Sequence, residues 1–195
     1  MKRWVVRGSP GAAEIEEIAA VIRSGAVILM PTDTIYGLHA MATDESAARI
    51  AQIKDRDEVK RFVTIAASIE QLESLGAEVP PVLRDIWPAP LTAVIRRGAQ
   101  SFAARVPDLQ WLRDVLQRTG PLISTSANRT GEAPIVEPAD LSPELLSEIN
   151  AIVDAGRREG KASAIVDFTG TEPRFIREGE PRFTQMLRKT LMKNL

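Results

Sequence analysis

Residues 121–131, PLISTSANRTG, gather many small hydrogen-bonding side chains at one point of the chain. The apolar lead of this segment runs directly into the hydroxyl and amide groups that lie between Ser124 and Asn128. Open α/β sheets bind ligands where their strands end, so such groups can hold a phosphate, a carboxylate or a nucleotide without a metal ion. The same residue types also form ordinary turns, and Gly131 would close one. This segment alone is compatible with both a ligand-binding strand end and an ordinary turn.

A second segment of this kind, PTDTIYGL at residues 31–38, follows the continuous apolar run 26–30. The run is typical of a strand that is covered on both faces. It breaks at a proline into two threonines that flank Asp33, and Gly37 suits a backbone that turns tightly or approaches a ligand. The spacing supports two interpretations equally. One is a ligand-binding segment, and the other is a capped strand end with Tyr36 in the core.

Four cations stand within eight residues, at Lys54, Arg56, Lys60 and Arg61. Three carboxylates in the same segment nearly cancel them, so a solvated helix end with weak ion pairs is one interpretation. The cluster immediately precedes an expected strand at 62–67, where Lys and Arg could clamp phosphate oxygens through charge-assisted hydrogen bonds.

Three polar residues interrupt or border apolar strand segments in the second half of the chain: Arg105, Ser163 and Arg177. A charged residue in such a strand either faces outward or is paired in a cleft. His39, the only histidine, is a weak candidate for catalysis, because a histidine beside an apolar run is more often a core residue.

The composition restricts the chemistry that is available. The 195 residues carry a net charge of −1 and contain no cysteine, which excludes disulfides, thiolate nucleophiles and cysteine metal sites. One histidine nearly excludes a His-based triad. No stretch suits a signal peptide or approaches the roughly 18 apolar residues of a membrane span, so we expect a cytoplasmic protein without a membrane partner.

Alternating helices and strands must position these groups. Isoleucines at three- and four-residue spacing predict a helix from Ser9 to Gly25, and Asp44 and Asp108 are expected to cap two others. Further strands are expected at 91–96, 102–106, 151–153, 164–168 and 174–177, before a basic C-terminal helix. The pattern predicts one α/β (α+β) domain around a mixed sheet, because several strand pairs have connections too short for parallel crossovers.

Together these segments resemble the Sua5/YrdC/YciO family, whose members make threonylcarbamoyl-adenylate. The similarity covers about residues 14–179, and eight markers stand in the family's order: PTDTIYGL, KDR, WPAPLT, ARVP, STSAN-x-TG, IVDAG, SAIVD and FIREG. The resemblance implies a single YrdC-like domain over residues 1–195, with a core of about 12–180. It also implies a twisted mixed sheet flanked by helices, with a concave basic cleft.

The resemblance implies two sets of site residues. The ATP-binding set is Lys54, Arg56, Lys60, Ser101, Ser126 and Asn128, of which Lys54 and Arg56 are implied to be catalytic. The set facing threonine or its carbamoyl group is Thr32, Arg105, Ser124, Ser163 and Arg177. No side chain stands out as a dedicated metal ligand.

The implied reaction joins L-threonine, bicarbonate and ATP into threonylcarbamoyl-AMP and pyrophosphate, for the t6A modification of tRNA. Mg2+ would accompany ATP, held chiefly by its phosphates. The product would pass to a tRNA threonylcarbamoyl transferase. We expect at most weak tRNA binding, because a net charge of −1 offers few uncompensated cations.

Departures from the family pattern leave a second possibility. Asp57 and Glu178 stand where prolines are common among the synthases, as in a YciO-like paralogue that binds nucleotide with weak or no synthase activity. The intact Ser126-Ala127-Asn128 favours the synthases. Smaller departures are His39, Ala155 and Ala164. An RNA-binding or ribosome-associated factor is a third possibility, and we expect the C-terminal domain of the longer Sua5 proteins to be absent.

Overall fold

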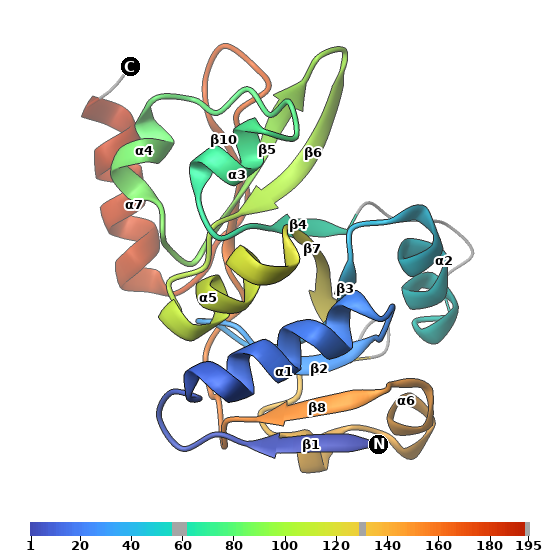
Figure 1. Cartoon of the computed structure of the whole chain (residues 1–195). Coiled ribbons are helices and arrows are strands. Elements are labelled where there is room, and N and C mark those ends of the chain that lie inside the picture. The colour runs from blue at the N-terminus through green and yellow to red at the C-terminus, as the bar shows by residue number, and fades with distance from the viewer. Residues whose placement is uncertain (56–61, 129–131, 194–195) are drawn as a thin grey trace.

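One mixed β-sheet organises the computed structural model, which describes residues 1–55, 62–128 and 132–193 (Figure 1). Ten strands in the described ranges follow the spatial order β1-β8-β2-β3-β7-β4-β6-β5-β9-β10. Their bounds are β1 Lys2–Val5, β2 Ile28–Pro31, β3 Tyr36–Met41, β4 Val63–Ile65, β5 Leu91–Arg97, β6 Gln100–Arg105, β7 Leu122–Ser126, β8 Ala151–Asp154, β9 Ala164–Asp167 and β10 Arg174–Arg177. The helices are α1 Ala12–Arg23, α2 Asp44–Ile53, α3 Ile69–Glu73, α4 Val82–Ile86, α5 Gln110–Thr119, α6 Pro143–Glu148 and α7 Pro181–Lys193, with a short 3-10 turn, η1, at Pro138–Asp140.

The sheet combines parallel and antiparallel pairs, which confirms the predicted fold class. Strand β8 pairs in parallel with β1 and β2, as β4 does with β6 and β5 with β9. The remaining neighbours are antiparallel. The strands β1, β8 and β2 lie across the lower part of Figure 1, whereas β5 and β6 run upward, so the sheet twists strongly between its two ends.

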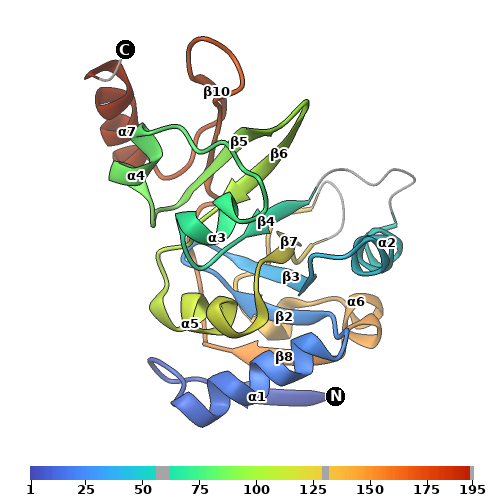
Figure 2. The ribbon, with the colours of Figure 1, turned by 45° about the horizontal axis from the view of Figure 1, so that its top comes forward.

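The lower half of the sheet is covered on both faces. Helices α1 and α5 lie side by side against one face, where Ile18, Ile22, Trp111 and Leu112 join one core cluster (Figure 2). Helices α2 and α6 cover the other face through a second cluster that contains Ile50 and Leu145. This two-sided burial explains why β2 reads as a continuous apolar run.

In the upper half, α3, α4 and α7 share a third core cluster with alternate strand residues. Leu91 and Ala93 of β5, Ala104 of β6 and Ala164 and Val166 of β9 belong to this cluster. Because successive side chains point to opposite faces of a strand, the residues between them face away from these helices. That second face is where a cleft can form.

The structure corrects the sequence-based elements at two places. Ser124, Thr125 and Ser126 lie within strand β7, so the ordinary-turn interpretation of this segment is wrong for these three residues. Cross-strand hydrogen bonding decides this, since Thr125 pairs with Leu38 and Ser124 with Val63. The proline-rich turns around residue 81 include a helix, α4. A proline is compatible with the start of a helix, where its missing N–H is not needed, and Pro81 stands at that position.

No described helix combines the length and the apolar character that crossing a membrane requires.

His39 is fully buried in β3, at the centre of the sheet. Its Nε2 lies 3.1 Å from the Met30 carbonyl oxygen, which can only accept, so Nε2 carries the proton. Gly37 leaves room for the imidazole, because an added Cβ would lie 2.9 Å from Nε2 and 2.8 Å from the Thr125 oxygen. Burial lowers the pKa of His39 to about 4, and the nearby charge of Arg105 adds to this.

Because this folded-state pKa lies below the ordinary 6.5, the unfolded chain binds a proton more readily between pH 6.5 and 4. We expect the free energy of unfolding to fall by about 2 kcal/mol between pH 7 and pH 5. Urea unfolding at both pH values measures this change. His39→Gln removes the chain's only imidazole and should flatten the dependence. An equally steep dependence in the variant would exclude His39 as its source.

Candidate functional site

A cavity of about 590 Å3 opens where the two halves of the sheet meet. Segments from β3, β4, β5, β6, β7, β9 and β10 contribute to its lining, together with the turn between β2 and β3. The predicted site residues that line it are Thr32, Arg105, Ser124, Ser126, Asn128, Ser163 and Arg177. All five residues of the predicted threonine set and two of the predicted ATP set, Ser126 and Asn128, therefore meet in one place.

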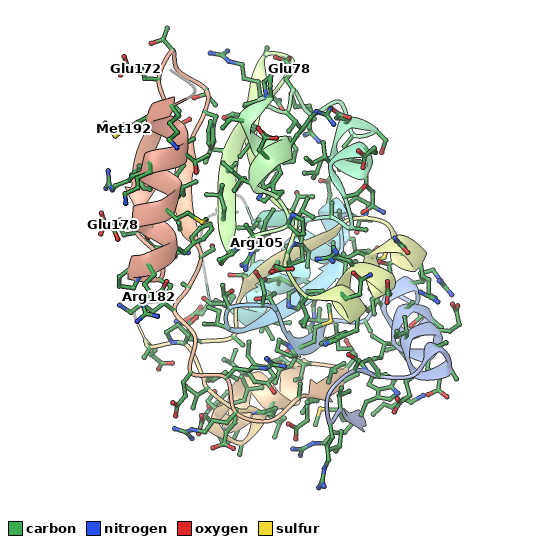
Figure 3. All side chains as sticks on the ribbon, turned by 90° about the vertical axis from the view of Figure 1, so that its left-hand side faces the viewer. Glu78, Arg105, Glu172, Glu178, Arg182 and Met192 are labelled. Carbon is green, nitrogen blue, oxygen red and sulfur yellow. The ribbon has the colours of Figure 1, made fainter. Side chains whose placement is uncertain are left out.

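A buried ion pair holds Arg105, one of the residues that line the cavity. Arg105 Nη2 lies 2.5 Å from Asp33 Oδ1, and Nη1 donates to Thr34 Oγ1 at 3.0 Å. The side chains of Arg105 and Asp33 are each only 7% exposed, so the two charges compensate each other away from water. Figure 3 places Arg105 near the middle of the molecule, where the upper and lower halves join.

The turn that supplies Asp33 is itself held by hydrogen bonds. Thr32 Oγ1 lies 2.8 Å from Thr34 Oγ1 and 3.1 Å from the Ile35 carbonyl oxygen, and it accepts from the Thr34 amide at 3.2 Å. The guanidinium of Arg105 is therefore fixed before any ligand binds. Both Nη atoms of Arg105 already donate to the protein, so the side chain is paired in a cleft, one of the two alternatives for a charged residue in an apolar strand. Each Nη retains a second N–H.

A second guanidinium, that of Arg177, faces the same cavity. Its Nε and Nη2 donate to the Ser163 carbonyl oxygen at 3.0 and 2.9 Å, and Ser163 Oγ lies 2.9 Å from Thr92 Oγ1. Burial lowers the pKa of Arg177, and repulsion from Arg105 lowers it further. Two cations that repel each other in a shared cavity favour an anionic ligand between them.

Lys54 lies beneath the Ser126–Asn128 segment and is 2% exposed. Its Nζ donates to the Ser126 carbonyl oxygen at 2.7 Å, to the Asn128 carbonyl oxygen and, at 3.3 Å, to Asn128 Oδ1. Ser126 Oγ in turn contacts Asn128 Oδ1, and Asn128 Nδ2 donates to the Glu132 carbonyl oxygen at 2.5 Å. Lys54 thus gives this segment its shape and places a positive charge under it.

The connection between β8 and β9, residues 155–163, closes one side of the cavity. Tyr36 Oη donates to the Gly156 carbonyl oxygen at 2.7 Å and accepts from the Ala155 amide at 3.0 Å. Further along, Gly160 packs so tightly on the Asp33 turn that an added Cβ would lie 2.2 Å from the Thr34 oxygen. These contacts fix Ser163, at the end of the connection, against the cavity.

The remaining predicted residues are not brought into this cavity. Arg56 and Lys60 lie outside the described residues, as does Asp57. Ser101 lies on β6 but does not line the cavity. Its role at ATP, like that of Lys54 on the phosphates, stays a prediction.

The predicted sets did not include Thr34, Thr92 and Ile165 of the lining, nor Asp33 as the partner of Arg105. Asp33 and Thr34 belong to the PTDT segment, where two threonines around a carboxylate were the available signal. Thr92 and Ile165 gave no sequence signal of a site, since threonine and isoleucine are common in strands.

The described residues contain no cluster of three or more histidine, cysteine, aspartate or glutamate side chains that could hold a metal ion. The cavity's own chemistry is that of guanidinium, hydroxyl and amide groups, which bind carboxylates and phosphates.

The chain matches the model of the Sua5/YciO/YrdC family, described as "Telomere recombination", over residues 20–179. It therefore belongs to this family, as its motifs suggest. A threonylcarbamoyl-AMP synthase from Pyrococcus abyssi is 31% identical over 183 residues, which cover 85% of this chain and 54% of the relative.

Two solved structures have the same fold. That of P. abyssi Sua5 complexed with L-threonine superposes with a TM-score of 0.88 at 26% identity, over 98% of this chain and 61% of the other. The E. coli YciO structure gives 0.82 at 20% identity, over 92% and 97%. The chain thus spans little more than half the length of the P. abyssi relative, and the YciO likeness concerns the fold alone.

Removing Asp33 should destabilise the fold by about 3 kcal/mol or more, because Arg105 would stay buried without its counter-charge. Urea unfolding of Asp33→Ala measures this. The control is Glu159→Ala, which breaks an ion pair to Arg157 whose side chains are 70% and 57% exposed. That change should cost less than about 1 kcal/mol. Similar small losses in both variants would refute the importance of the buried pair.

Gly160→Ala tests the packing of the 155–163 connection. Its methyl group cannot coexist with the Thr34 oxygen, so we expect a loss of about 1–3 kcal/mol in thermal unfolding. Gly170→Ala is the matched control, since an added Cβ there would lie 3.7 Å from the Glu172 carbonyl oxygen, an ordinary contact distance. It should shift stability by about 0.5 kcal/mol or less. Equal melting of the two variants would contradict the close approach.

Proposed function

We propose that this protein is an L-threonylcarbamoyladenylate synthase, a nucleotidyltransferase that forms threonylcarbamoyl-AMP and pyrophosphate from L-threonine, bicarbonate and ATP. One observation carries the proposal. The guanidiniums of Arg105 and Arg177 share a cavity with the Ser126–Asn128 segment that Lys54 braces. An amino-acid carboxylate and a nucleotide phosphate could therefore be held side by side. Membership of the family and the similarity to a protein named threonylcarbamoyl-AMP synthase support it.

The chemistry asks for positioning and charge neutralisation more than for a protein nucleophile. The threonine amine loses a proton and adds to CO2 derived from bicarbonate, which forms a carbamate. A carbamate oxygen then bonds to the α-phosphorus of ATP, and the bond to the bridging oxygen breaks as pyrophosphate leaves. Arg105 and Arg177 would donate hydrogen bonds to the carboxylate and carbamate groups, and Arg177 would supply the positive charge that no carboxylate contact among the described residues compensates. Lys54, with Arg56 from outside the described residues, would act on the phosphates, and ATP would enter as its Mg2+ complex.

A YciO-like paralogue that binds nucleotide without full synthase activity is the alternative, favoured by Asp57 and Glu178. Asp57 lies outside the described residues. The Glu178 carboxylate is 66% exposed and pairs with Arg188 of α7 at 2.7 Å, on the side of the molecule seen in Figure 3. Its charge is therefore engaged outside the cavity, so this departure gives the alternative little support.

Hand-over of the product to a tRNA threonylcarbamoyl transferase, weak tRNA binding and a cytoplasmic location remain parts of the proposal that await their own tests.

Turnover should depend on threonine and on Lys54. The wild-type protein should release pyrophosphate from ATP only when L-threonine and bicarbonate are both present. Lys54→Ala should lower this rate about 100-fold or more, because the Ser126–Asn128 segment loses its supporting charge. Lys189→Ala, which removes an exposed cation on α7, should leave the rate unchanged.

Thermal melting checks that both variants fold. Pyrophosphate release without threonine would contradict the synthase, and a folded, fully active Lys54→Ala protein would remove Lys54 from the site.

A further inference from the structure

Four side chains form a row across adjacent strands beside the cavity. Thr92 of β5 pairs with Ile165 of β9, which pairs with Arg177 of β10. Ala93 pairs with Ala104, so one step further along the antiparallel pair Thr92 lies beside Arg105 of β6. This cross-strand row therefore reads Arg105, Thr92, Ile165, Arg177, and all four residues line the cavity.

The row lies on the face of the sheet that points away from α3, α4 and α7. Residues next to its members in the chain, including Ala93, Ala104 and Ala164, are buried in the core cluster under those helices. Cross-strand partners share a face, so Thr92 and Ile165 lie next to each other on the cavity side. Ile165 is half-buried and is not a member of that core cluster.

Other apolar side chains line the cavity, and Ile165 is the one that stands in the row between Arg105 and Arg177. Between the two guanidiniums of the row stand the Thr92 hydroxyl, 2.9 Å from Ser163 Oγ, and the apolar side chain of Ile165. The row thus offers charge for a carboxylate, hydroxyl groups for a hydroxyl, and an apolar surface for a small alkyl group. Threonine carries these last two groups, a hydroxyl and a methyl, on the same carbon. Serine lacks the methyl.

We infer that Ile165 determines the preference of this protein for threonine over serine, by contact with the substrate methyl group. The inference rests on the proposed function and adds to it a residue that selects the amino acid. Burial of one methyl group in an apolar contact corresponds to about a fourfold preference, and a closely fitted pocket can reach ten- to 200-fold. The Thr92 and Ser163 hydroxyls bind what both amino acids share, so they cannot supply this discrimination.

The test compares kcat/KM for L-threonine and for L-serine by pyrophosphate release. We expect the ratio of kcat/KM for threonine to kcat/KM for serine to fall about fourfold or more from wild type to Ile165→Ala. Only kcat/KM for threonine should change. Ile165→Val, which keeps a branched side chain, should retain most of the ratio. The control is Val94→Ala, which alters the same face of β5 two residues from Thr92 but does not line the cavity. It should leave the ratio unchanged.

The serine value separates selection from damage to the fold, because a merely structural role would lower both values together. An unchanged ratio in Ile165→Ala, or an equal loss with both amino acids, would overturn the inference while the synthase activity stands. Absence of threonine-dependent turnover in the wild-type protein would instead overturn the proposed function, and the inference with it.

Discussion

The site depends on one buried ion pair, between Arg105 of β6 and Asp33 of the β2–β3 turn. Residues 33 and 105 belong to opposite halves of the twisted sheet, so the pair joins the halves where the cavity lies. Burying either charge alone would be strongly unfavourable, and their mutual contact, with the Thr34 hydroxyl, offsets much of that penalty. The Arg105 guanidinium, which lines the cavity, is thereby fixed in advance, which is the condition for electrostatic stabilisation without reorganisation.

The twist and the placement of the helices create the space around this pair. Helices cover both faces of the lower strands, whereas α3, α4 and α7 pack on one face of the upper strands. Alternation along β5, β6 and β9 then sends Thr92, Arg105 and Ile165 to the other face. The Gly160 contact with the Asp33 turn and the Tyr36 hydroxyl hold the 155–163 connection over that face. A polar cavity results from ordinary strand periodicity.

The sequence allowed the mixed sheet and most elements to be predicted, because apolar periodicity depends on local residue order. The sequence identified Arg105, Ser163 and Arg177 as candidates, since a charge or a hydroxyl within or beside an apolar strand can be recognised from residue order alone. It did not predict that Lys54 would donate to the carbonyls of Ser126 and Asn128, because that contact joins residues more than 70 positions apart. The place of Ile165 in the cavity could not be predicted for the same reason, because it depends on the pairing of Ile165 with Thr92 on a neighbouring strand.

The central claim is that this cavity joins a threonine carbamate to AMP. The most direct measurement incubates the protein with ATP, L-threonine and 13C-labelled bicarbonate and analyses the products by mass spectrometry within seconds of mixing. The account predicts a threonylcarbamoyl-AMP species that carries one 13C atom and depends on L-threonine. ATP consumption without that labelled species, or a complete lack of turnover by the folded protein, would contradict it.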